Sequence, residues 1–289
     1  MKIYFFFVYI SGDQLVQMFN LRKTVFLYIG RHRRRFLIQR SIELIKKLIN
    51  SYENKNNDHR TNGEFFVLRK LSQLKFNVIF DVGANIGNWS ITAASIFPTS
   101  RIFAFEPVPE LYRKCSSRVS KIENISPCNI GLSDQTKTAT FNFYPHLKLF
   151  NSLYDIPRNE KPKQIKVKMT LGDEFCLNNN IDHIDFLKLD VEGAEYDILN
   201  GFATFLREKR ITTIQFEYGF HNIITKRLLA DYYELLRGLG FVVGKIYPNY
   251  VDFRDYDYEM ENFIHSNFLA IIKTREDIID SLSGQRSLI

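Results

Sequence analysis

The chain has 289 residues, of which 45% are hydrophobic and 25% are charged. These values are ordinary for a folded globular protein and exclude a wholly disordered one. The net charge of +7 is concentrated at the N-terminus, where residues 1–50 hold ten Lys and Arg against two Asp and Glu and leave residues 51–289 with a net charge of −1. Because nucleic-acid binding depends on clustered Lys and Arg, we expect no nucleic-acid partner for the rest of the chain.

Residues 1–61 form a basic extension in this prediction. The apolar run at residues 3–10 is shorter than the roughly 20 residues of a membrane-spanning helix. From Arg33 to Tyr52, Leu and Ile recur at helical spacing between Arg and Lys, which predicts a basic amphipathic helix. Residues 31–50 are therefore candidates for contact with an anionic membrane surface. The alternative is a helix that packs on its own domain or on a second subunit of an oligomer.

The three cysteines favour a reducing, cytoplasmic location. Cys115, Cys128 and Cys176 are odd in number and show no metal-ligand spacing. The Asn-rich stretch at residues 51–63 is typical of a linker, so we place the main domain at residues 62–289, beginning with a helix at Glu64 to Leu74.

Beyond residue 76, short apolar runs alternate with helical stretches, which predicts βαβ units and a mostly parallel sheet. The predicted strands are 78–82, 102–106, 128–132, 186–189 and 213–217. A helical stretch at 226–239 precedes two further strands, 241–247 and 267–273, which would form an antiparallel edge. Alternating residues between 138 and 169 predict an inserted β-hairpin, with a loop that caps a substrate pocket.

A candidate cofactor site follows the first predicted strand. The strand ends at Asp81, and the chain then turns through Gly83, Ala84 and Gly87 into a helix. Small residues at such a turn let a ligand approach the backbone, but the spacing lacks the third glycine of the dinucleotide-binding motif. Glu106 ends the next strand about twenty residues later, where a carboxylate can accept hydrogen bonds from two ribose hydroxyls.

A second group of acids follows the strand at 186–189. Asp190, Glu192 and Glu195 lie where parallel sheets bind ligands, and Glu217 ends the following strand. Asp190 is a candidate base or, with Glu217, a candidate ligand of a divalent metal, whereas the alternative for these acids is interaction with a helix dipole. His183 is a weaker candidate base.

The sequence resembles the FkbM family of methyltransferases. The resemblance rests on DVGANIGNWS (81–90), FEPVPELY (105–112), NIGLSD (129–134) and FLKLDVEGAEYDILNG (186–201), and it covers about residues 62–274. It implies a Rossmann-like class I methyltransferase fold and S-adenosylmethionine as the cofactor. The residues that it implies for cofactor binding are Asp81, Gly83, Ala84, Asn85, Gly87, Glu106, Ser133 and Asp134. Where the family commonly has Thr-Leu-Asp-Asp, this chain has Thr-Leu-Gly-Asp at 170–173.

These observations predict an O-methyltransferase that acts on a hydroxyl of a sugar, a glycan or a secondary metabolite. Asp190, Glu192 and Glu217 are the candidate catalytic residues. One alternative is an RNA or protein acceptor, which the basic extension would favour, although the Asn/Asp-Pro-Pro-aromatic motif common in amino-group methyltransferases is replaced here by Asp190-Val191-Glu192-Gly193. The other is a membrane-docked interaction protein of the same fold without turnover.

Overall fold

The computed structural model describes residues 12–144 and 161–284, and the chain divides into two compact units, Met1–Tyr52 and Glu53–Ile289. The first unit contains helices α1 (Gly12–Arg31) and α2 (Phe36–Tyr52). No side chain of α2 is buried, and Leu37, Leu44 and Leu48 are all exposed. In the described ranges, no helix is both long and apolar enough to cross a membrane.

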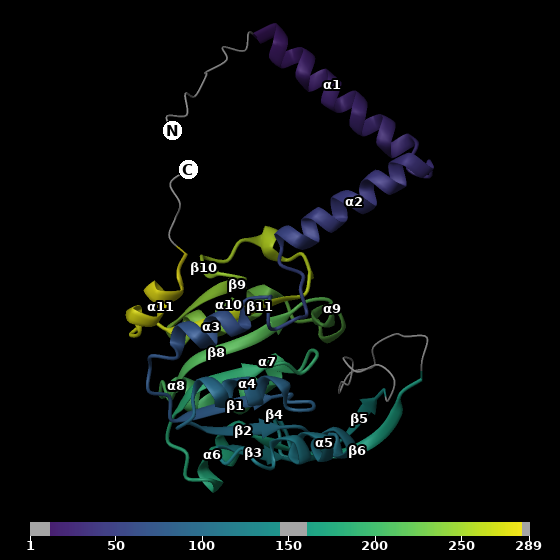
Figure 1. Cartoon of the computed structure of the whole chain (residues 1–289). Helices are drawn as coiled ribbons and strands as arrows, with labels where there is room; N and C mark the ends of the chain where they lie inside the picture. The colour runs from purple at the N-terminus through teal and green to yellow at the C-terminus, as the bar shows by residue number, and fades with distance from the viewer. Residues whose placement is uncertain (1–11, 145–160, 285–289) are drawn as a thin grey trace. The chain divides into compact units, whose positions relative to one another are not determined.

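The second unit is built on an eight-stranded sheet with the order β10-β9-β11-β8-β7-β1-β2-β3 (Figure 1). Strands β8, β7, β1, β2 and β3 are parallel, while β11, β9 and β10 add an antiparallel edge. This order confirms the predicted Rossmann-like class I methyltransferase sheet. Its strands are β1 (Val78–Val82), β2 (Arg101–Phe105), β3 (Ile125–Cys128), β7 (Ile184–Leu189), β8 (Ile211–Tyr218), β9 (Phe241–Tyr247), β10 (Tyr250–Phe253) and β11 (Ser266–Ile272).

Helices cover both faces of the sheet, because its central strands are apolar on both sides. One face packs on α3 (Glu64–Leu71), α4 (Asn88–Ile96), α5 (Pro109–Val119) and α11 (Glu276–Leu282). The other packs on α6 (Gly172–Asn178), α7 (Glu195–Gly201), α8 (Ala203–Arg207) and α10 (Leu229–Gly238). Two short helical segments, α9 (His221–Thr225) and η1 (Tyr258–Met260), lie in loops.

The inserted hairpin is also confirmed. Strand β5 (Lys137–Phe143) pairs with β6 (Lys163–Leu171), and β6 also pairs with the short β4 (Gly131–Ser133). The predicted strand at 128–132 is wrong in its bounds: the third strand of the large sheet ends at Cys128, and β4 belongs to the small sheet. Most of the loop proposed to cap the pocket lies outside the described residues.

Residues 53–63, which we call the strap, are tied to the antiparallel edge of the large sheet. The amide of Asn54 donates hydrogen bonds to the carbonyl oxygens of Asn62 (2.7 Å) and Ile246 (3.0 Å). The carboxylate of Glu53 pairs with Lys245, and a Cβ on Gly63, whose φ is +107°, would lie 2.2 Å from the carbonyl oxygen of Tyr247. These contacts could not be predicted from the sequence, since Asn is typical of linkers and ordered turns alike.

Candidate active site

A cavity of about 700 Å³ lies at the carboxyl ends of β1, β2, β7 and β8, where parallel sheets bind ligands. The strap supplies part of its wall through Lys55, Asn57 and His59. Two groups of residues about a hundred positions apart in the sequence also line the cavity. The first lies between Asp81 and Glu106, and the second between Asp190 and Glu217. The fold therefore joins both predicted sites in one space.

The turn after β1 is held against the neighbouring strands. The amides of Gly83 and Ala84 both donate to the carbonyl oxygen of Phe105, at 3.0 and 2.9 Å. Gly83 has a φ of +88°, and a Cβ there would lie 1.9 Å from the carbonyl oxygen of Asp190. Only glycine fits this position. The absence of a side chain lets the turn after β1 contact the loop after β7.

Glu106 lies directly after β2 with its side chain in the cavity wall. One carboxylate oxygen accepts the amide of Asn85 and the other that of Val108, each at 2.9 Å. Burial outweighs these two hydrogen bonds and raises the pKa of Glu106 to about 8. The carboxylate is thus fixed at the position where the sequence predicts recognition of a ribose.

Asp81 is fully buried and lies between two polar partners. The hydroxyl of Ser90 donates to Oδ2 at 2.6 Å, and Nζ of Lys188 lies 3.5 Å from Oδ1. Neither Asp81 Oδ1 nor Nε1 of Trp89, both in the cavity wall, has a hydrogen-bond partner within the described ranges. These two buried atoms can bind polar groups of a ligand.

Ser133 and Asp134 do not reach the cavity in this structure. The Ser133 hydroxyl donates to the carboxylate of Asp134 at 3.0 Å, and the cavity wall contains Gly131 and Leu132 instead. Gly87 also lies outside the wall: a Cβ there would meet Sγ of Cys115 at 2.9 Å, so its fit is against helix α5.

Asp190 forms an ion pair with the buried Lys188 (2.8 Å). Burial alone would lower the pKa of Lys188 and raise that of Asp190, but their mutual attraction, with Asp81 as a further partner of the lysine, reverses both directions. Asp190 is therefore held as a carboxylate whose affinity for a proton is low.

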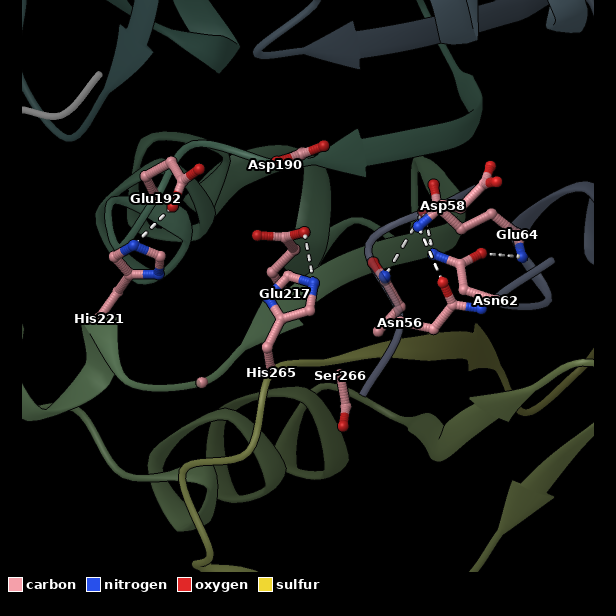
Figure 2. Close-up of polar contacts among 12 residues, drawn as sticks. Asn56, Asp58, Asn62, Glu64, Asp190, Glu192, Glu217, His221, His265 and Ser266 are labelled. Atoms are coloured by element: carbon pink, nitrogen blue, oxygen red, sulfur yellow. Dashed lines mark hydrogen bonds and ion pairs between the residues drawn. The ribbon is translucent and has the colours of Figure 1, made fainter. Parts of the chain in front are cut away.

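Two carboxylates beside Asp190 face imidazole rings (Figure 2). Glu192 Oε2 lies 2.5 Å from Nε2 of His221, and Glu217 Oε1 lies 3.5 Å from Nε2 of His265. Burial, followed by the charges of Asp190 and Glu192, raises the pKa of Glu217 well above its usual range. Neither histidine could be predicted from the sequence, because each comes from a loop whose place beside β7 is set by sheet order alone.

His183, the weaker candidate base, is at the other end of the sheet. It precedes β7, whereas the cavity lies beyond the end of that strand, and its Nε2 is 2.7 Å from the hydroxyl of Thr212. Within the part of the chain that the structure describes, no three His, Cys, Asp or Glu side chains gather as metal ligands. The suggested metal pair, Asp190 and Glu217, therefore has no third ligand there.

Comparisons with known proteins point to one family. A model described as the Methyltransferase FkbM domain matches residues 81–243, more than half of the chain. The chain is 30% identical over 159 residues to AMB antimetabolite synthetase AmbE of Pseudomonas aeruginosa, in an alignment that covers 43% of this chain but only 8% of AmbE.

Two further similarities come from a shorter relative and a solved structure. Hexuronic acid methyltransferase AglP of Haloferax volcanii is 26% identical over 177 residues, which cover 58% of this chain and 70% of AglP. The crystal structure of methyltransferase FkbM from Methylobacillus flagellatus aligns with a TM-score of 0.42 and 14% identity over 68% of this chain and 43% of that one. On the match of the family model, the chain belongs to the FkbM family of methyltransferases.

Proposed function

We propose that the protein transfers a methyl group from S-adenosylmethionine to a hydroxyl of a sugar, a glycan or a secondary metabolite. The observation that carries the proposal is the single cavity that contains both the Glu106 site and the cluster of Asp190, Glu192 and Glu217. A donor and an acceptor must meet within a few ångströms for transfer, and one space at the carboxyl end of the sheet allows this.

The residues present suit S-adenosylmethionine in three respects. The Glu106 carboxylate can accept the two ribose hydroxyls. The buried Oδ1 of Asp81 can accept a hydrogen bond from an amino group. The excess of carboxylates over lysines in the wall favours a cationic ligand. When bound, this molecule supplies a methyl group on a positively charged sulfur.

The acceptor half of the proposal rests on Asp190, Glu192 and Glu217. Carboxylates and imidazoles can hold several hydroxyls of a polyhydroxylated ring, and the name of AglP specifies a hexuronic acid as the substrate of that relative. We propose a small-molecule or glycan acceptor and residues 62–289 as the catalytic domain, with the strap completing its cavity.

Calorimetric titration tests the donor half. The folded protein is expected to bind S-adenosylhomocysteine, the product of methyl transfer, with one site per chain and a Kd on the order of 1–100 μM. Adenosine diphosphate is the control ligand, since its two phosphates would meet the carboxylates of the cavity wall. A folded sample that releases no heat with S-adenosylhomocysteine would contradict the proposal.

A second part of the proposal concerns α2, which we propose docks on the cytoplasmic surface of an anionic membrane. Its exposed Leu37, Leu44, Ile45, Leu48 and Ile49 alternate with Arg40, Lys46 and Lys47, a pattern that suits burial of one face among lipid headgroups. The full chain is expected to sediment with vesicles containing phosphatidylserine, and Leu44→Asp with Leu48→Asp is expected to abolish this. Equal sedimentation of this variant and the wild type would refute docking through α2.

A further inference from the structure

Among the contacts in the cavity, the pair of Glu192 and His221 is the tightest between a carboxylate and an imidazole. Nε2 of His221 lies 2.5 Å from Oε2 of Glu192, against 3.5 Å for His265 and Glu217. The two residues come from the loops after β7 and β8, which are adjacent parallel strands, and both line the cavity. Figure 2 shows His221 facing Glu192 beside Asp190 and Glu217.

The backbone of Glu192 is held in an unfavourable conformation that points its carboxylate at the ring. Its φ is +58°, in the left-handed region that non-glycine residues avoid, and Gly193 follows with a φ of +110°. The carboxylate of Glu195 stabilises this loop by accepting the amides of Val191 (3.1 Å) and Gly193 (3.0 Å). The hydrogen bonds that Glu195 accepts therefore offset part of the cost of this conformation.

The residues that flank His221 are also held in place. The amide of Gly219 donates to Oδ1 of Asn222 at 2.9 Å, and the Asn222 amide donates to the hydroxyl of Tyr232 at 3.3 Å. The ring of Phe220 lies 3.8 Å from the His221 ring between centroids. His221 is 5% exposed, so its ring is held in one place at the cavity wall.

Asp190 is less suited to take a proton, because its pairing with Lys188 lowers its pKa. Glu217 lies 3.5 Å from Nε2 of His265, and burial raises its pKa well above the usual range. A carboxylate in close contact with the other nitrogen makes an imidazole a more effective general base, because the negative charge stabilises the imidazolium that forms.

We propose that His221, oriented by Glu192, is the catalytic base that accepts the proton of the acceptor hydroxyl. This inference rests on the proposed O-methyl transfer. The hydroxyl proton passes to Nδ1 of His221 as the acceptor oxygen forms its bond to the methyl carbon. The sulfur–carbon bond of the donor breaks and leaves its electron pair on the sulfur, so the products are a methyl ether, a neutral thioether and an imidazolium that then loses its proton to water.

The test uses the full chain, tritiated S-adenosylmethionine labelled in the methyl group, and the pool of glycans and small metabolites extracted from the cells that make this protein. His221→Gly is expected to lower the rate of methyl incorporation at least about 100-fold. Added imidazole is expected to raise the rate of the His221→Gly variant about tenfold or more, because the free base replaces the lost ring. Affinity for S-adenosylhomocysteine is expected to stay within about twofold of the wild type, since the change removes no donor contact.

Glu192 is a positioning residue in this proposal, and a double-mutant cycle tests that role. Glu192→Gln is expected to lower kcat with the KM for the donor unchanged. In the His221→Gly background without added imidazole, it is expected to cause no further loss of rate, because no ring remains for Glu192 to orient. A purely structural role of Glu192 would lower both rates.

His183→Gln is the matched control, since His183 lies at the opposite end of β7, and it is expected to leave the rate unchanged. If wild type transfers label and His221→Gln transfers it at the same rate, or if imidazole rescues His265→Gly and not His221→Gly, His221 is not the base. If wild type transfers no label to the extract, the proposed function fails, and the base assignment fails with it.

Discussion

Replacing Glu106 with alanine is expected to raise the Kd for S-adenosylhomocysteine about 100-fold. The amides of Asn85 and Val108 hold the carboxylate in place, so it is already oriented to accept two hydrogen bonds from the ribose. Hydrogen bonds to a charged group contribute about 1.5–3 kcal/mol each, and loss of the pair is expected to cost about 3 kcal/mol of binding. Titration calorimetry measures this directly.

The control for this variant is Glu208→Gln, which changes an exposed carboxylate paired with Arg210 and is expected to bind as the wild type does.

Binding at Glu106 is also expected to depend on pH. Because the pKa of Glu106 is raised to about 8 and the ribose hydroxyls favour the ionised form, binding tightens as the pH rises toward 8 and levels off above it. Glu106→Gln is expected to remove this dependence, and equal affinity of Glu106→Ala and the wild type would exclude ribose recognition by Glu106.

Replacing Lys188 with methionine is expected to destabilise the protein by about 3–5 kcal/mol, the usual cost of removing one partner of a buried ion pair. Lys188 is 3% exposed and lies between Asp81 and Asp190, so its loss leaves the fully buried Asp81 without its counter-charge. Urea unfolding followed by circular dichroism measures the change.

Lys166→Met serves as the comparison, because Lys166 is exposed on β6 and bonds only to the hydroxyl of Thr140 among the contacts described. It is expected to change the free energy of unfolding by less than about 0.5 kcal/mol. If Lys188→Met is as stable as Lys166→Met, the ion pairs of Lys188 with Asp81 and Asp190 do not stabilise the fold.

The sheet was predictable because its central strands are buried on both faces. Continuous apolar runs gave β1 and β9 with the bounds that the structure shows, and the alternating segments gave the hairpin. The strand near Cys128 was misplaced, since Gly131 to Ser133 is equally apolar but pairs with β6 in the small sheet. Pairing between distant segments decides such cases, and local pattern does not.

The acids of the cavity were found from the sequence because each lies near the carboxyl end of a strand, either in its last residues or directly after it. The imidazoles were not, since neither His221 nor His265 lies in a motif and their meeting with Glu192 and Glu217 depends on strand order. The strap was missed for a related reason: its partners are about 190 residues away, at Lys245 and Ile246. Contacts of that range leave no local trace in composition or periodicity.

Transfer of a carbon-13 methyl group from S-adenosylmethionine to a fractionated extract of the source cells tests the central claim most directly. We predict that the label appears in the glycan and small-metabolite fraction, and that nuclear magnetic resonance of the purified product shows the methyl group bonded to oxygen. Label on nitrogen or carbon, label confined to RNA or protein, or no label from a protein that binds S-adenosylhomocysteine would contradict the account.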